Sequence, residues 1–200
     1  MTKIKLCGLT RKQDIHTANK LKPDYIGFVF AKKSRRYLPL EKAAELKKIL
    51  NPEIKAVGVF VNEEPSAAAK IAQQNIIDVI QLHGDEDEEY ISALRCLTDV
   101  PVIQAFKVRS NADIIEAEAS SADYVLLDGG AGDGKTFDWD IIKNIKRPYF
   151  LAGGLDAKNA ADAIKALRPY ALDVSSGIET DGKKDTEKMA AFVAAVREEI

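Results

Sequence analysis

A short apolar run recurs eight times along the chain, roughly every 25 residues. Each run is rich in Val, Ile, Phe or Tyr and has the length of a β-strand. The runs are KIKLCGL (3–9), YIGFVF (25–30), KAVGVFV (55–61), VIQLHG (79–84), PVIQAFKV (101–108), YVLLD (124–128), YFLAGG (149–154) and ALDVSSG (171–177). This spacing leaves room for one helix after each strand, which favours parallel strands joined by helical connections.

The segments between the runs have the pattern of helices, because their apolar residues repeat at intervals of three and four. Such segments include 40–50, 66–75, 86–95 and 160–168. Strand and helix alternate without a linker or a low-complexity stretch. The sequence therefore predicts an α/β protein, a single (β/α)8 TIM barrel domain over residues 1–200.

Composition restricts the partners of such a barrel. With 46% hydrophobic and 30% charged residues, the 200-residue chain can bury one large core. Its net charge is only -2 and its one tight basic cluster is KKSRR (32–36), so we expect no nucleic-acid partner. No apolar stretch approaches the ~20 residues of a membrane helix, and we expect the N-terminal residues to enter a strand directly, without the apolar region of a signal peptide. We expect a cytoplasmic protein with no membrane association, either monomeric or homodimeric.

Alternation along each strand sends successive side chains to opposite faces. The apolar face of a barrel strand packs under the helices, so Ile4 and Leu6 of the first run are expected outside. The same rule points these side chains into the barrel: Lys5, Cys7, Gln81, His83, Asp128, Asp173 and Ser175. Most of them lie near the C-terminal ends of their strands, where barrel enzymes carry their catalytic groups.

Cys7 and Asp128 are the candidate base and acid of this site. Lys5 lies on the same strand face as Cys7, two residues away, and its ammonium group is expected to lower the pKa of the thiol. Cys96 has no such setting and is expected to be structural. Both cysteines are expected to be reduced, because they lie far apart in the sequence.

Two inward residues have alternative interpretations. Asp173 can neutralise Lys5 inside the barrel or bind a substrate hydroxyl, and it can do both. His83 lies at a strand end before an acidic stretch, so it either enters the next helix or lines the mouth of the barrel. The only other histidine, His16, is expected on a helix, and the two have no metal-ligand spacing. We expect no metal site.

The last two strands run into Gly and Ser turns, which predicts a phosphate site. Gly153 and Gly154 end the seventh run, and Ser176 and Gly177 end the eighth. Glycines expose backbone N–H groups, and a following helix adds the positive end of its dipole. Two adjacent turns of this kind indicate a phosphorylated substrate.

One motif supports a different function. GGAGDGKT (129–136) matches the nucleotide-binding pattern G-x-x-x-x-G-K-[ST] and precedes a segment expected to be helical, 137–144. It would suit an NTPase or a nucleotide-binding regulatory module. However, only 64 residues would follow the motif, and the first five strand and helix units would have no role in such a fold.

Several segments together resemble the phosphoribosylanthranilate isomerase family. They are KIKLCGLT (3–10), SRR (34–36), QLHGD (81–85), LLD (126–128), GKTFDW (134–139), LAGGL (151–155) and DVSSGIE (173–179), in the order that the family has them. The resemblance implies a (β/α)8 barrel that isomerises N-(5-phosphoribosyl)anthranilate by an Amadori rearrangement in tryptophan biosynthesis. It implies no cofactor.

The resemblance also implies roles for individual residues. Asp128 is the general acid, Cys7 is the general base, and Arg36 pairs with the anthranilate carboxylate, for which a guanidinium is suited. Asp173 lies near the sugar hydroxyls. The phosphate-binding turns match at Gly153, Gly154, Ser176 and Gly177.

The chain departs from the family pattern at Ala131 and Asp133, in the loop after the sixth run, and at Arg35, where proline is common. A related alternative is an aminoaldose isomerase of histidine biosynthesis. Such an enzyme normally has an Asp base in place of Cys7.

Overall fold

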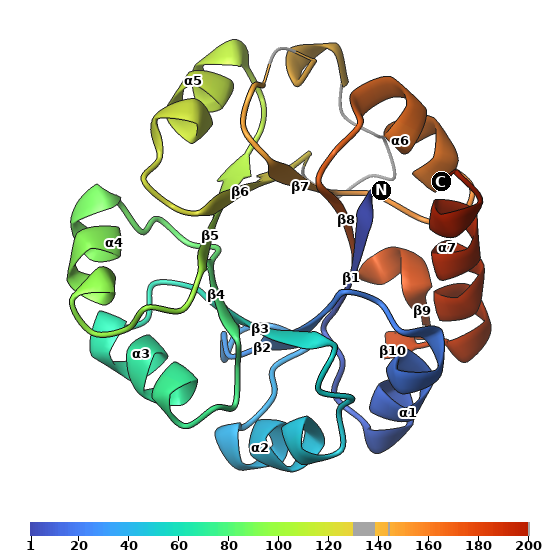
Figure 1. The fold of residues 1–200 in the computed structure, drawn as a ribbon, viewed down its shortest axis with the longest axis horizontal. Coiled ribbons are helices and arrows are strands. Elements are labelled where there is room, and N and C mark those ends of the chain that lie inside the picture. Colours follow the sequence, from blue (N-terminus) through green and yellow to red (C-terminus); the bar gives the residue numbers. More distant parts are fainter. Residues whose placement is uncertain (130–138, 144, 200) are drawn as a thin grey trace.

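Eight parallel strands form a closed barrel in chain order, and helices surround it (Figure 1). This architecture comes from a computed structural model that describes residues 1–129, 139–143 and 145–199. The strands are β1 (Lys3–Cys7), β2 (Tyr25–Val29), β3 (Lys55–Phe60), β4 (Val79–Leu82), β5 (Val102–Lys107), β6 (Tyr124–Asp128), β7 (Tyr149–Ala152) and β8 (Ala171–Val174). The predicted α/β barrel is confirmed.

Helices follow the strands as the sequence predicted, with one exception. The α-helices are α1 (Lys12–Leu21), α2 (Leu40–Lys48), α3 (Pro65–Gln73), α4 (Glu88–Arg95), α5 (Asn111–Ala119), α6 (Ala160–Leu167) and α7 (Thr186–Glu198). Between β6 and β7 the described residues hold a 3-10 helix, η1 (Trp139–Ile141), where an α-helix was expected over 137–144. The remainder of that segment, apart from 142–143, lies outside the described residues. None of the described helices has the length and apolarity needed to cross a membrane.

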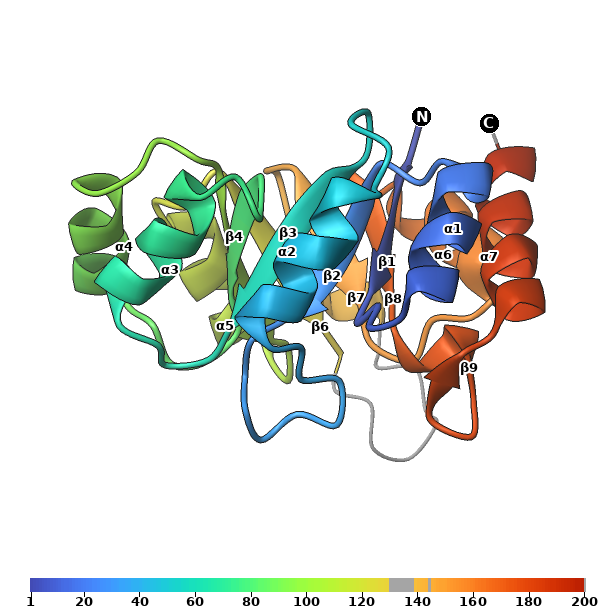
Figure 2. The same cartoon turned by 90° about the horizontal axis from the view of Figure 1, so that it is seen from below.

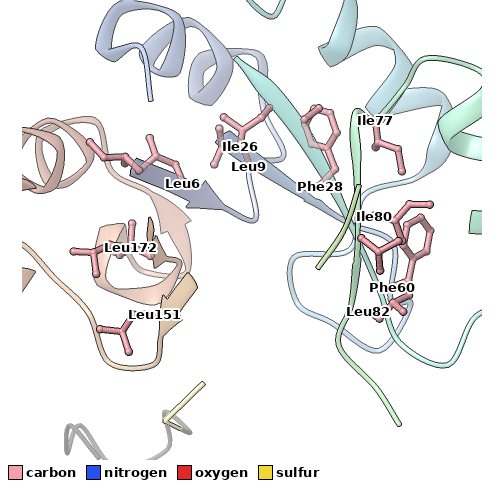
Figure 3. Close-up of a cluster of buried hydrophobic side chains, with 14 of the residues drawn as sticks. Leu6, Leu9, Ile26, Phe28, Phe60, Ile77, Ile80, Leu82, Leu151 and Leu172 are labelled. Carbon is pink, nitrogen blue, oxygen red and sulfur yellow. The ribbon is translucent and has the colours of Figure 1, made fainter. Parts of the chain in front are cut away.

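The larger hydrophobic core fills the space between the barrel and its helices. Ile4 and Leu6 are buried in it, on the outer face predicted by alternation. Figure 3 shows part of this cluster, in which Leu6, Ile26 and Leu172 come from neighbouring strands. A smaller core fills the barrel itself, and its members include Val57, Ile103, Leu126 and Phe150. The alternation therefore divides each strand between two cores.

Aromatic rings close the N-terminal end of the barrel. Tyr25 and Tyr124 are the first residues of β2 and β6, and Tyr170 precedes β8. All three rings pack within 6 Å of another aromatic ring, and the hydroxyls of Tyr25 and Tyr170 are 3.0 Å apart. The rings pack across this end, whereas the cavity lined by Cys7 and Asp128 lies at the C-terminal ends of the strands.

Irregular segments surround that open end. They include the long connection between β2 and α2, the 3-10 helix η2 (Ser176–Ile178) and the hairpin of β9 (Glu179–Thr180) and β10 (Lys183–Lys184). In Figure 2 the β2–α2 connection and β9 lie along the lower edge. Strands β4 and β8 end earlier than expected, which places His83 and Ser175 in these mouth segments.

Candidate active site

A cavity of about 390 Å³ opens at the C-terminal end of the barrel, a size suited to a small ligand. All but one of the predicted site residues line it: Cys7, Arg36, Gln81, His83, Asp128, Gly153, Gly154, Asp173 and Ser176. Gly177 does not line the cavity but directly follows Ser176. The structure therefore brings together residues that lie as far apart in the chain as Cys7 and Ser176.

Cys7 ends β1 and lies among apolar side chains. It is buried and packs with Val29 and Val59. A Cβ atom on Gly27 would lie 2.6 Å from the Cys7 sulfur, so the missing side chain on β2 makes room for the thiol. Burial raises the pKa of the Cys7 thiol, and the nearby Lys5 lowers it by less. The expectation of a lowered pKa is therefore wrong, because desolvation outweighs the ammonium.

Lys5 and Asp173 form a buried ion pair beneath the cavity. The two residues are neighbours in the β1–β8 register, and their Nζ and Oδ2 atoms are 2.7 Å apart. Burial disfavours the charged Lys5, but Asp173 and Cys7 outweigh it and raise its pKa. The expectation that Asp173 neutralises Lys5 is confirmed. The second oxygen of Asp173, like the Oε1 atom of buried Gln81, has no hydrogen-bond partner within the described residues.

A short chain of polar groups leads from Gln81 to Asp128. Gln81 Nε2 lies 2.8 Å from His83 Nδ1, and His83 Nε2 lies 3.6 Å from Asp128 Oδ2. With the Gln81 amide nitrogen as donor, Nδ1 of His83 is the acceptor and the ring N–H lies on Nε2, on the side of Asp128. His83 therefore lines the mouth, as one of its two interpretations predicted.

The turns after β7 and β8 favour glycine for two different reasons, the backbone conformation in the first and close packing in the second. Gly153 and Gly154 have φ angles of 97° and 64°, in the region that other residues rarely adopt. A Cβ on Gly177 would lie 2.0 Å from the Leu155 carbonyl oxygen, so this glycine lets the two turns pack together. In the closed strand order β7 and β8 lie between β6 and β1. The turns therefore separate Asp128 from Cys7 along the rim.

Arg36 is already paired with a carboxylate of this chain. Its Nε and Nη2 atoms donate to the two oxygens of Glu179 at 2.6 and 2.7 Å. Lys184 Nζ lies 2.6 Å from the same carboxylate. The sequence analysis assigned no role to Glu179 or Lys184. The available signal was the Asp181–Gly182 dipeptide, typical of a tight hairpin turn that returns the chain beside Glu179.

This network makes stability depend on pH. Burial favours the neutral form of Glu179, but hydrogen bonds from Arg36 and Lys184 outweigh it and lower the pKa from 4.5 to about 2. Glu179 therefore contributes stability that is complete above pH 4.5 and is lost as the pH falls toward 2. Glu179→Gln is expected to cost stability at neutral pH, and the difference from wild type should shrink across that window. Urea unfolding at a series of pH values measures it, and a pH-independent difference would contradict the assignment.

A second cavity, of about 430 Å³, shares only His83 and Asp128 with the first. Acidic side chains dominate its lining: Asp85, Glu86, Asp87, Glu88, Asp113 and Glu116. Repulsion between like charges makes it unsuited to an anionic ligand. No group of three or more His, Cys, Asp or Glu side chains in the described part of the chain is placed to hold a metal.

Other predictions from the sequence concern the loop after β6 and the two cysteines. Ala131, Asp133 and the nucleotide-binding pattern 129–136, except Gly129, lie outside the described residues. Cys96 is exposed at the end of α4, so its expected structural role is wrong. Both cysteines are free thiols, as expected.

Comparisons with known proteins show which family the chain is similar to. The family model described as N-(5'phosphoribosyl)anthranilate (PRA) isomerase matches residues 4–195. An N-(5'-phosphoribosyl)anthranilate isomerase from Thermoanaerobacter sp. (strain X514) is 45% identical over 204 aligned positions, which cover 98% of each chain.

Solved structures give the same result. The phosphoribosyl anthranilate isomerase from Thermotoga maritima superimposes with a TM-score of 0.92 at 35% identity, covering 99% of this chain and 100% of that one. A phosphoribosyl anthranilate isomerase in complex with reduced 1-(o-carboxyphenylamino)-1-deoxyribulose 5-phosphate has a TM-score of 0.89, with the same identity and coverage.

Proposed function

The chain belongs to the N-(5'-phosphoribosyl)anthranilate isomerase family, and we propose that the cavity lined by Cys7 and Asp128 is its active site. The enzyme isomerises N-(5-phosphoribosyl)anthranilate to 1-(2-carboxyphenylamino)-1-deoxyribulose 5-phosphate, an Amadori rearrangement of tryptophan biosynthesis. We further propose that residues 1–200 act as one domain. A cytoplasmic location follows from the substrate, because a phosphorylated anion does not cross membranes freely.

The observation that carries this assignment is the order of groups around the barrel rim. The substrate has a phosphate at one end, a carboxylate at the other and a ribose between them. The glycine turns follow β7 and β8, and Arg36 follows β2. In the closed strand order β1 lies between β8 and β2, so Cys7 lies between the two anion anchors. A substrate held at both ends would have its ribose over the thiol.

The proposed reaction uses Asp128 as acid and Cys7 as base. Asp128 donates a proton to the furanose ring oxygen, the bond from that oxygen to C1′ breaks, and the nitrogen lone pair forms a protonated Schiff base. Cys7 then removes the proton from C2′, and the electron pair of that C–H bond yields the enolamine. The 2′-hydroxyl loses its proton as C1′ gains one, which gives the ketone. No step requires a metal or a cofactor.

The remaining predicted residues would bind and orient the ribose. Gln81 Oε1 and Asp173 Oδ1 are buried acceptors that lack partners within the described residues, and both residues line the cavity. Sugar hydroxyls are donors that would satisfy them, which offsets the cost of burying these oxygens. His83 Nε2 lies 3.6 Å from Asp128 Oδ2, and a small approach of the two groups would let the ring orient the acid. Gly153, Gly154, Ser176 and Gly177 would hold the phosphate.

A fluorescence assay of substrate consumption by the purified chain tests the function. We expect loss of the fluorescence of N-(5-phosphoribosyl)anthranilate, with the same rate when EDTA is added. No consumption at micromolar enzyme would contradict the proposal. Turnover of only the histidine-pathway aminoaldose would instead support the related isomerase. Saturable ATP or GTP binding with Mg²⁺ in a thermal-shift titration would support the nucleotide-binding alternative.

A further inference from the structure

One edge of the Arg36 guanidinium is occupied and another is available. The group carries five N–H donors in one plane, and Glu179 takes the Nε donor and one donor of Nη2. Among the described residues no partner takes the two Nη1 donors or the second Nη2 donor, and the Nη1 and Nη2 donors together form an edge that matches a second carboxylate. Arg36 lines the cavity. Its contact with Glu179 therefore selects which edge a ligand can meet.

The surroundings fix this orientation. The Glu179 side chain is 11% exposed, and Lys184, 2% exposed, also bonds the backbone oxygen of Ser175 at 2.8 Å. Along the aliphatic stem, a Cβ on Gly8 would lie 2.5 Å from Arg36 Cδ, so the glycine lets the arginine lie against the loop after β1. The long Arg36 side chain is thus held at its guanidinium and along its stem before a ligand arrives, which lowers the entropy lost on binding.

Lys184 adds a positive charge to this group: burial lowers the pKa of its ammonium, and Glu179 opposes that shift. Arg36 and Glu179 alone would form a neutral pair, which attracts a further carboxylate weakly. Lys184 adds a cation 2.6 Å from the Glu179 carboxylate, so the three groups together carry one net positive charge. That charge matches the single negative charge of a benzoate-type carboxylate.

We propose that Glu179 is a positioning residue that presents the free edge of Arg36 to the anthranilate carboxylate, and that Lys184 supplies the charge this requires. This inference rests on the proposed function and on the role of Arg36 in it. A purely structural network would only attach the β9–β10 hairpin to the barrel, and its loss would affect substrates with and without a carboxylate alike.

The test compares two substrates in Glu179→Gln and wild type. They are N-(5-phosphoribosyl)anthranilate and N-(5-phosphoribosyl)aniline, which lacks the carboxylate. For the first, we expect kcat/KM to fall about 10- to 100-fold, because one charged hydrogen-bonded contact is misplaced. The loss should appear mainly in KM, since the carboxylate is bound alike before and during the reaction. For the aniline substrate we expect little change. Glu187→Gln, at an exposed position on α7, is the matched control.

A second pair of variants keeps the test decisive if Glu179→Gln does not fold. Lys184→Met should also lower the preference for the carboxylate substrate, whereas Lys183→Met, at the exposed neighbouring position, should leave it unchanged. An equal loss for both substrates, or an unchanged preference in Glu179→Gln and Lys184→Met, would overturn the inference and leave the isomerase function intact. A wild-type enzyme inactive on both substrates would instead overturn the proposed function.

Discussion

Cys7→Ser is expected to lower kcat for N-(5-phosphoribosyl)anthranilate by about 10³-fold while the barrel remains folded. Serine fits the space that Gly27 leaves beside the thiol, so the change removes a base without creating a large cavity. A hydroxyl has a much higher pKa than a thiol, and its anion is not formed near neutral pH. The variant therefore loses proton abstraction from C2′ and keeps the anion anchors.

The measurement combines the fluorescence assay with circular dichroism and with binding of reduced 1-(o-carboxyphenylamino)-1-deoxyribulose 5-phosphate. Binding close to that of wild type would show that the site is intact. Cys96→Ser is the matched control, because Cys96 is exposed at the end of α4. Full activity in Cys7→Ser would remove Cys7 from the mechanism.

The raised pKa of Cys7 is compatible with this role. Burial among Val29 and Val59 raises the pKa of the thiol, so only the thiolate fraction of Cys7 can take the C2′ proton, but that thiolate is the stronger base for it. Lys5 stabilises this thiolate most, and Lys184 adds to it, since both ammonium groups lower the pKa of Cys7 and so oppose burial. The site therefore combines a reactive base with a fixed counter-ion beneath it.

The sequence could predict those features that depend only on residues close together in the chain, such as the face of a strand to which a side chain points. Strand alternation is local, so it placed Lys5 and Cys7 inside the barrel and Leu6 outside, and the β1–β8 register then joins Lys5 to Asp173. The net pKa of Cys7 could not be predicted this way. It depends on how deeply Val29 and Val59, from other strands, bury the thiol.

The ion pair between Arg36 and Glu179 could not be predicted from the sequence either. Glu179 lies 143 residues away and reaches Arg36 through η2 and a two-stranded hairpin. Contacts between the segments at the C-terminal end depend on how these segments pack on the folded barrel. No periodic pattern in the sequence predicts them. The family resemblance named the arginine but not the carboxylate that orients it.

Asp128→Asn is expected to lower kcat by a similar factor, about 10³-fold, through a different step. The amide has nearly the shape of the carboxyl group, so it fits beside Gly153, whose Cβ position lies 2.8 Å from Asp128 Oδ1. However, it cannot donate an acidic proton to the ring oxygen. Asp99→Asn, at an exposed position before β5, is the control for the same chemical change outside the cavity.

Deuterium at C2′ of the substrate separates the two roles. In Cys7→Ser proton abstraction becomes the slow step, so deuterium should slow turnover by a full primary isotope effect. In Asp128→Asn ring opening becomes slow instead, and because no bond to the C2′ hydrogen breaks in that step, the isotope effect should nearly vanish. The same effect in both variants would mean that the acid and base do not act in separate steps, and a reversed pattern would exchange their roles.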